Sequence, residues 1–195
     1  MKRRIFKKNS VFREWTESIV IAFVLAMFIR AFFIQAFKIP SGSMIPTLIE
    51  RDRLMVNKLR YGPRVPFTRH KRLPGLTSPE RGDVIVFVYP MDPSRDFIKR
   101  LVALEGEEVE IKEGDLYIDG ALIRTPVVKN IYYDNGVNYG QEGEPFTVPE
   151  GYVFVLGDNS SSSSDGRVWG FVPHENIIGR AELIYWPFSR MRFIK

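Results

Sequence analysis

The chain of 195 residues is long enough for one membrane anchor and one domain of ordinary size, and its 45% of hydrophobic residues exclude wholesale disorder. It has no cysteine, which excludes disulfides, thiolate metal sites and a cysteine nucleophile. The formal net charge is +5, but six basic residues lie in the first fourteen positions, so the basicity belongs partly to a tail and does not favour a nucleic-acid partner.

An apolar run at residues 18–37 has the length that an α-helix needs to cross the hydrocarbon core of a membrane. The basic residues in front of it predict that residues 1–17 stay in the cytoplasm and that residues 38–195 lie on the other side. A cleavable signal peptide has the same order of basic and apolar segments, but its apolar region is shorter and ends in an Ala-x-Ala site that is missing here. We therefore expect an uncleaved transmembrane anchor.

The stretch IPSGSMIPTL, residues 39–48, directly follows this apolar run. It allows three interpretations: a turn that ends the helix, a site at which the helix is cleaved off, or the position of a serine nucleophile. Pro40 cannot continue a helix, and Gly42 lets the backbone bend, so a turn is expected under all three.

Beyond Pro40, short apolar runs alternate with turn sequences, which predicts a mainly β domain and not a βαβ fold. The run of five serines at 160–164 is by itself typical of a flexible linker. Residues 105–150 are rich in turns and are predicted to form a smaller β subdomain inserted into one core. Strands are expected at residues 53–59, 83–89, 96–104, 108–112, 116–119, 146–148, 151–157 and 181–186.

The motifs that are missing narrow the possible chemistry. With no cysteine, only two histidines and no cluster at ligand spacing, no metal site is expected. GxSxG, P-loop and GxGxxG motifs are also missing, so a serine nucleophile would need a base other than histidine, and lysine is the known alternative.

A lysine base must be neutral near physiological pH, so burial must lower its pKa from about 10.4. Most lysines stand in tails, loops or solvent-facing positions, whereas Lys99 interrupts the apolar run DFIKRLVAL. Strand alternation places Phe97 and Leu101 on the same face as Lys99. The strand pattern alone nevertheless favours a solvent-facing lysine on an edge strand.

Five segments in order resemble bacterial type I signal peptidase, the membrane-bound Ser-Lys enzyme that removes signal peptides from exported proteins. They are the apolar span, IPSGSMIPTL (39–48), RGDVIVFVYP (81–90), DFIKRLVALEGEEV (96–109) and GDNSSSSSDGRVWGFVP (157–173). The resemblance implies a β-rich catalytic core of the signal-peptidase and LexA-like kind, with a smaller inserted β subdomain. It further implies that Ser43 is the nucleophile and Lys99 the general base, and that Ser41 and the backbone N–H of Ser43 form the oxyanion hole.

The resemblance also implies roles for residues around this dyad. Ser163 would orient Lys99, although residues 160–162 and Gly166 depart from the commonest family pattern, so that a neighbouring serine remains an alternative. A structural ion-pair cluster would consist of Arg100, Asp158, Asp165 and Arg167. Shallow pockets for small substrate side chains would be lined by Phe37, Ile39, Met44 and Ile98, with further contacts from Phe32, Phe33 and Trp186.

The implied partners are the signal peptides of secreted preproteins, the lipid bilayer of the bacterial inner membrane and the protein-export machinery. No cofactor, metal or nucleic acid is expected. Two alternative functions explain the sequence less well. A self-cleaving LexA-like repressor would need a helical DNA-binding domain where the apolar run stands. An anchored β domain that binds partners or lipids would explain the turn composition of 40–47, but not why Lys99 and the GDN…DGR segment accompany it.

Overall fold

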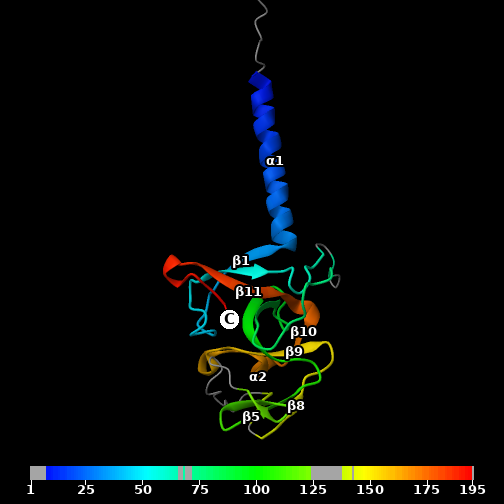
Figure 1. The fold of residues 1–195 in the computed structure, drawn as a ribbon, viewed down its shortest axis with the longest axis vertical. Helices are drawn as coiled ribbons and strands as arrows, with labels where there is room; N and C mark the ends of the chain where they lie inside the picture. Colours follow the sequence, from blue (N-terminus) through cyan, green and yellow to red (C-terminus); the bar gives the residue numbers. More distant parts are fainter. Residues whose placement is uncertain (1–7, 66–67, 69–71, 124–137, 142, 195) are drawn as a thin grey trace, which may run out of the picture.

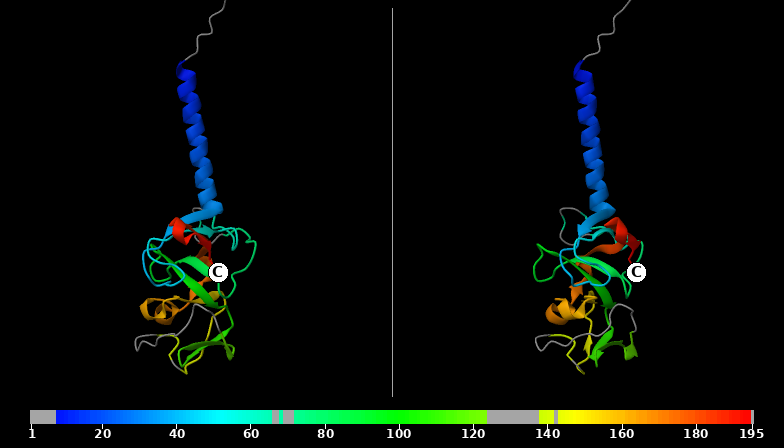
Figure 2. Two further views of the ribbon diagram at one scale, coloured as in Figure 1. Left: turned by 60° about the vertical axis from the view of Figure 1, so that its left-hand side comes forward. Right: turned by 90° about the vertical axis from the view of Figure 1, so that its left-hand side faces the viewer.

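A long helix precedes the β-rich body of the molecule. The computed structural model of the chain describes residues 8–65, 68, 72–123, 138–141 and 143–194. Helix α1, Lys8–Phe32, stands clear of the body (Figure 1 and Figure 2). Its segment Phe12–Phe32 has a mean hydropathy of 1.7 and is not covered by the rest of the protein. Length and composition therefore fit a membrane anchor.

The predicted end of this helix at residue 37 is wrong. Helix α1 ends at Phe32, and Ile34–Lys38 forms strand β1, which pairs antiparallel with β2, Arg53–Asn57. Sheet pairing satisfies the backbone groups that a longer helix would have satisfied internally. The apolar run continues without a break from α1 into β1, so composition alone did not reveal the change.

Two antiparallel sheets make up the body and confirm the prediction of a mainly β fold. The larger has the order β1-β2-β11-β3-β4-β9-β10, with β12 beside β11, and the smaller has the order β7-β6-β5-β8. The smaller sheet lies at the end of the molecule opposite α1 (Figure 1). The remaining elements are β3 (Val84–Val88), β4 (Asp96–Ala103), β5 (Glu108–Lys112), β6 (Asp115–Ile118), β7 (Ala121–Leu122), β8 (Phe146–Thr147), β9 (Tyr152–Leu156), η1 (Ser160–Ser162), α2 (Gly166–Trp169), β10 (Val172–Pro173), η2 (His174–Asn176), β11 (Ile177–Trp186), η3 (Phe188–Arg190) and β12 (Arg192–Phe193).

All eight predicted strands overlap observed ones, and the strands that the prediction lacked are β1 and the two-residue β7, β10 and β12. The small sheet falls within the predicted insertion at 105–150, between β4 and β9. Residues 124–137 and 142 of that insertion, and residues 1–7 of the predicted tail, lie outside the described residues. The domain boundaries therefore stay a prediction.

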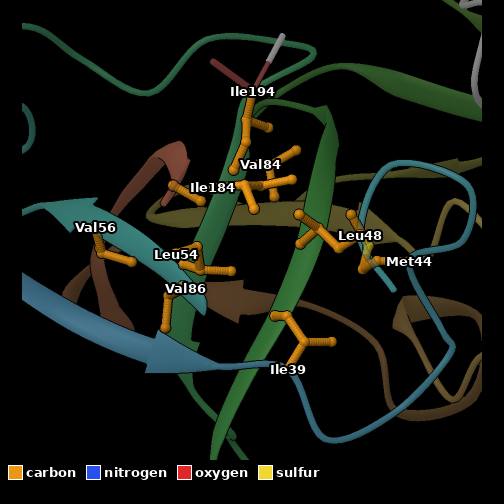
Figure 3. Packing of buried hydrophobic residues seen from close by; sticks show 10 residues of the cluster. Ile39, Met44, Leu48, Leu54, Val56, Val84, Val86, Ile184 and Ile194 are labelled. Atoms are coloured by element: carbon orange, nitrogen blue, oxygen red, sulfur yellow. The ribbon is translucent and has the colours of Figure 1, made fainter. Parts of the chain in front are cut away.

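The loop between β1 and β2 is packed as part of the core. The two ends of the loop are joined by hydrogen bonds from the Ile39 N–H to the Asp52 carbonyl and from the Arg51 N–H to the Ile39 carbonyl, both 2.9 Å. Ile39, Met44 and Leu48 of this loop join a buried apolar cluster with residues of β2, β3 and β11 (Figure 3). Each enclosed side chain of this size contributes about 1.5–3 kcal/mol, so the loop backbone is tied to the sheet.

The C-terminal segment holds the same loop from outside. The Arg190 guanidinium donates to both carboxylate oxygens of the fully buried Asp52, with Nε–Oδ1 and Nη2–Oδ2 distances of 3.0 Å. Arg192 Nη2 donates to the Thr47 carbonyl at 2.8 Å, and Ile194 is buried in the apolar cluster. The last residues of the chain thus restrain a loop that lies some 140 residues earlier.

Candidate active site

Ser43 and Lys99 meet in the folded chain, although 56 residues separate them in sequence. The Lys99 Nζ lies 2.7 Å from the Ser43 Oγ, which is hydrogen-bond distance. Only 8% of Ser43 and 4% of Lys99 is exposed. A hydroxyl and an amine in direct contact and shielded from water form the pair that nucleophilic catalysis with a lysine base requires.

The strand pattern alone favoured a solvent-facing Lys99 on an edge strand, and that interpretation is wrong. Strand β4 lies between β3 and β9 in the larger sheet. Lys99 pairs with Ile85 of β3, and its Nζ lies 5.6 Å from the centre of the Phe97 ring. The strand that covers the other side of β4 comes about fifty residues later, so local sequence could not show that β4 is internal.

Burial lowers the pKa of Lys99 from 10.5 to about 8, because the ammonium loses its hydration. The carboxylates of Asp165 and Asp158 oppose this shift, since negative charge favours the ammonium. With a pKa near 8, about one amine in ten is neutral at pH 7. The neutral amine can accept a proton from the Ser43 hydroxyl, as a general base must.

Two hydrogen-bond donors at Ser41 and Ser43 have no partner among the described residues. Within the described part of the chain, neither the Ser43 backbone N–H nor the Ser41 hydroxyl has a hydrogen-bond partner. Ser41 is exposed to solvent two residues before the buried Ser43. Free donors beside the attacking oxygen are what an oxyanion hole needs, because they can bind a developing negative charge without first breaking other bonds.

The structure brings Ser163 to the site without bonding it to Lys99. The Ser163 Oγ is buried and makes no hydrogen bond with any described residue. It lies against Gly157, where an added Cβ would overlap the Ser163 side chain and come within 2.6 Å of the Ser43 carbonyl oxygen. Gly157 therefore lets the two serines approach, and the orienting role of Ser163 stays a prediction.

The four predicted charged residues form two bidentate ion pairs. Arg100 binds Asp158 through Nε–Oδ1 and Nη2–Oδ2 contacts of 2.8 Å. Arg167 binds Asp165 at 2.9 and 3.0 Å through the corresponding atoms. All four side chains are buried. Removing one partner would leave an uncompensated buried charge, which costs about 3–5 kcal/mol.

These pairs also shape the serine run at 160–164. Arg167 donates to the Ser160 Oγ and carbonyl at 2.9 and 2.7 Å, and Ser160–Ser162 forms the short helix η1. Asp165 accepts the Gly157 N–H at 3.0 Å, and this hydrogen bond joins the residues that precede and follow the serine run. The interpretation of the run as a flexible linker is wrong, because the side chains of Asp165 and Arg167, which directly follow it, hold it in place.

The four predicted substrate contacts lie in one apolar cluster. Met44 and Ile39 are buried within it, whereas Phe37 and Ile98 pack on it and stay partly exposed. The surface available to a ligand is thus made by Phe37 and Ile98, with the other two beneath them. The side chains of Phe32, Phe33 and Trp186 make aromatic contacts with Phe28 or Phe188 and are not part of this cluster.

Sequence reasoning missed Asn159. Its N–H donates to the Ser43 carbonyl at 3.0 Å, and its Nδ2 donates to the Gly42 carbonyl at 3.0 Å. Its place beside Asp158 in the GDN motif was the available signal, but no local rule connects that motif to residues 42–43. No group of three or more His, Asp or Glu side chains among the described residues is arranged to hold a metal ion.

Comparison with known proteins gives consistent matches over most of the chain. A family model described as "Signal peptidase, peptidase S26" matches residues 12–186. Signal peptidase I P of Bacillus subtilis subsp. natto is 35% identical over 198 residues, which cover 100% of this chain and 99% of that protein. Signal peptidase I of Pseudomonas aeruginosa is 33% identical, over 94% of this chain and 76% of that protein. The crystal structure of a signal peptidase I from Enterococcus faecalis V583 is 34% identical, covers 54% of this chain and 98% of its own, and has a TM-score of 0.44.

The buried amine predicts a pH-dependent effect of Lys99→Met on stability. Between the folded pKa of about 8 and the unfolded value of 10.5, the unfolded chain binds more protons, so stability rises with pH across this window. Below pH 8 the desolvation cost is fully present. Lys99→Met should therefore be more stable than the parent by about 3 kcal/mol at pH 7, and the difference should vanish toward pH 10.5. Urea unfolding of the whole chain in detergent measures this, with the exposed Lys112→Met as the control. A difference that does not change with pH would contradict a buried titrating amine.

Proposed function

The chain belongs to the signal peptidase family, peptidase S26, and from this membership we propose that Ser43 and Lys99 are the dyad with which it cuts signal peptides from exported preproteins after small residues. Its function is that of signal peptidase I, a serine peptidase. Membership in this family argues against both alternatives, a self-cleaving repressor and an anchored β domain that only binds partners or lipids. The observation that carries the assignment of the dyad is the 2.7 Å contact between the two buried side chains.

In the first step of the proposed mechanism, the neutral Lys99 amine takes the proton of Ser43 as the Ser43 Oγ attacks the scissile carbonyl carbon. The carbonyl oxygen becomes an oxyanion that the Ser43 N–H and the Ser41 hydroxyl bind. When this tetrahedral intermediate collapses, the C–N bond breaks and the Lys99 ammonium returns its proton to the departing amine. The signal peptide remains as an ester on Ser43, and the mature protein leaves with a new N-terminus.

Water completes the proposed cycle. Lys99 is neutral again after the first half, so it can take a proton from a water molecule that attacks the ester carbon. The same two donors bind the second oxyanion. Collapse breaks the bond to Ser43 Oγ, Lys99 returns the proton to that oxygen, and the signal peptide leaves as a carboxylic acid, which then releases its proton to solvent. The cycle needs no metal or cofactor, since one amine carries the proton in both halves.

Substrate selection is proposed to depend on the apolar cluster beside the dyad. Phe37 and Ile98 present partly exposed apolar surface over the buried Ile39 and Met44. We expect this surface to accept small side chains at the first and third positions before the cut. An extended substrate would add its backbone as a further strand, with alternate side chains reaching the pockets.

The bilayer is the second proposed partner. Exposed aromatic and apolar side chains of Trp186, Phe188, Met191 and Phe193 gather in the C-terminal segment. This segment lies at the level of β1, at the end of the body that α1 enters (Figure 1). Aromatic side chains favour the membrane interface. We place the anchor in the bacterial inner membrane, with the basic tail in the cytoplasm, the body outside, and the export machinery as the source of preproteins.

Substitution of either dyad residue should abolish cleavage of an exported precursor. Ser43→Ala removes the attacking oxygen and Lys99→Met removes the base, so each should lower kcat at least about 1000-fold. The purified chain in detergent is incubated with the precursor, and mass spectrometry maps the cut. Lys112→Met is the matched control for the lysine and should retain full activity. Undiminished cleavage by either dyad variant would overturn the mechanism.

The lysine base also predicts the pH dependence of cleavage. The ammonium form cannot accept a proton, so activity should fall on the acid side of about pH 8. The rate should decrease about tenfold per pH unit, reaching about one hundredth of its plateau at pH 6. Initial rates with a peptide that has no titrating side chains test this. A rate that stays flat from pH 8 to 5 would contradict a lysine base.

The proposed orientation can be tested because the chain has no natural cysteine. Ser78→Cys introduces one thiol on the exposed surface of the body, and Ser10→Cys introduces one in the predicted cytoplasmic tail, residues 1–17. A membrane-impermeant maleimide applied to intact spheroplasts should label only the Ser78→Cys chain. Both should be labelled after permeabilisation. Labelling of only the Ser10→Cys chain in intact spheroplasts would reverse the orientation.

A further inference from the structure

The direction of the Ser43 N–H depends on a single peptide unit. The Gly42–Ser43 peptide is trans, since the cis bonds among the described residues are at Pro46 and Pro187. In a planar trans peptide the carbonyl and the N–H point in opposite directions. Whatever holds the Gly42 carbonyl therefore aims the Ser43 N–H, which has no partner of its own in the described part of the chain.

Two donors hold the Gly42 carbonyl from one side. The Ile45 N–H donates to it at 3.2 Å from within the same loop. The Asn159 Nδ2 donates at 3.0 Å from a segment 117 residues away. The amide must be oriented this way, because a carbonyl oxygen can only accept and the Asn159 Oδ1 would repel it. The next carbonyl, that of Ser43, accepts the Asn159 backbone N–H at 3.0 Å.

Asn159 is itself held on both of its sides. Its Oδ1 accepts the Ser161 hydroxyl at 3.2 Å, and its carbonyl accepts the Ser162 N–H at 3.0 Å. The preceding residue, Asp158, is locked in its bidentate pair with the buried Arg100. The donor that reaches Gly42 thus comes from a restrained segment that can impose an orientation on the loop.

We infer that Asn159 is a positioning residue that aims the Ser43 N–H at the oxyanion of the cleavage reaction. The inference rests on the proposed function of Ser43. Asn159 does not touch the substrate; it acts through the Gly42–Ser43 peptide unit. An uncharged donor suits this role. A carboxylate at this position would repel the Gly42 carbonyl and would also favour the ammonium form of Lys99.

Two substitutions test this role. Asn159→Ala removes the side-chain donor and leaves the backbone bond to the Ser43 carbonyl. Asn159→Asp keeps the size and the acceptor for Ser161, but places an oxygen against the Gly42 carbonyl. Removal of an oxyanion donor costs about 100- to 1000-fold in kcat, and misdirection should cost about 10- to 100-fold. The KM for a precursor peptide should not change. Asn176→Ala is the matched control, because it removes an asparagine side chain that donates to the Val88 carbonyl, and parent kcat is expected.

Two readouts separate this role from a general loss of structure. A substrate-derived peptide aldehyde adds to Ser43 and places its new oxygen where the oxyanion forms, so its Ki should rise by the factor by which kcat falls. The pH at which activity of Asn159→Ala declines on the acid side should equal that of the parent, since Asn159 makes no hydrogen bond to Lys99.

Several results would overturn the inference. Parent kcat in either Asn159 variant would do so, as would a lower kcat with an unchanged aldehyde Ki. Unfolding of both variants at the assay temperature would show that the role is structural. If Ser43→Ala still cleaves, the proposed function fails instead. If Ser43→Ala is inactive while Asn159→Ala is fully active, only the inference about Asn159 fails.

Discussion

Taking the Lys99 amine out of water costs free energy, and the arrangement around the site follows from that cost. A lysine with a pKa near 8 is useful only if it stays buried and in contact with Ser43. An exposed lysine would be almost fully protonated at neutral pH. The larger sheet provides the burial by enclosing β4 between β3 and β9, and the packed loop after β1 provides the contact.

The charges nearest to Lys99 are arranged so that this depressed pKa survives. Asp158 and Asp165 are close enough to favour the ammonium form. Each is bound through both carboxylate oxygens to its own buried arginine, which offsets much of its negative field. The same pairs hold the segment that carries Asn159 and Ser163. The charge balance around Lys99 and the position of the loop that carries Ser43 thus depend on the same side chains.

Different parts of the chain restrain different points of the loop between β1 and β2, which carries Ser43. Apolar side chains anchor this loop in the core. Arg190 binds Asp52 at the end of the loop, and Arg100 and Arg192 bind Thr47 within it. Asn159 donates hydrogen bonds to the Gly42 and Ser43 carbonyls. Catalysis by positioning needs reacting groups held within fractions of an ångström, and a surface turn without such partners would not provide this.

Much of the secondary structure and the fold class could be predicted from local sequence, because apolar runs and turn residues act over a few positions. They determined the anchor helix, the mainly β body and the approximate positions of eight strands, and the ordered motifs singled out Ser43 and Lys99. Tertiary structure alone decided three further matters. The helix ends at Phe32 because β1 finds a partner in β2, Lys99 is buried because β9 covers β4, and Asn159 reaches Gly42 across 117 residues. Each depends on contacts between distant segments, and composition and periodicity within one segment carry no information about the partner that will lie beside it.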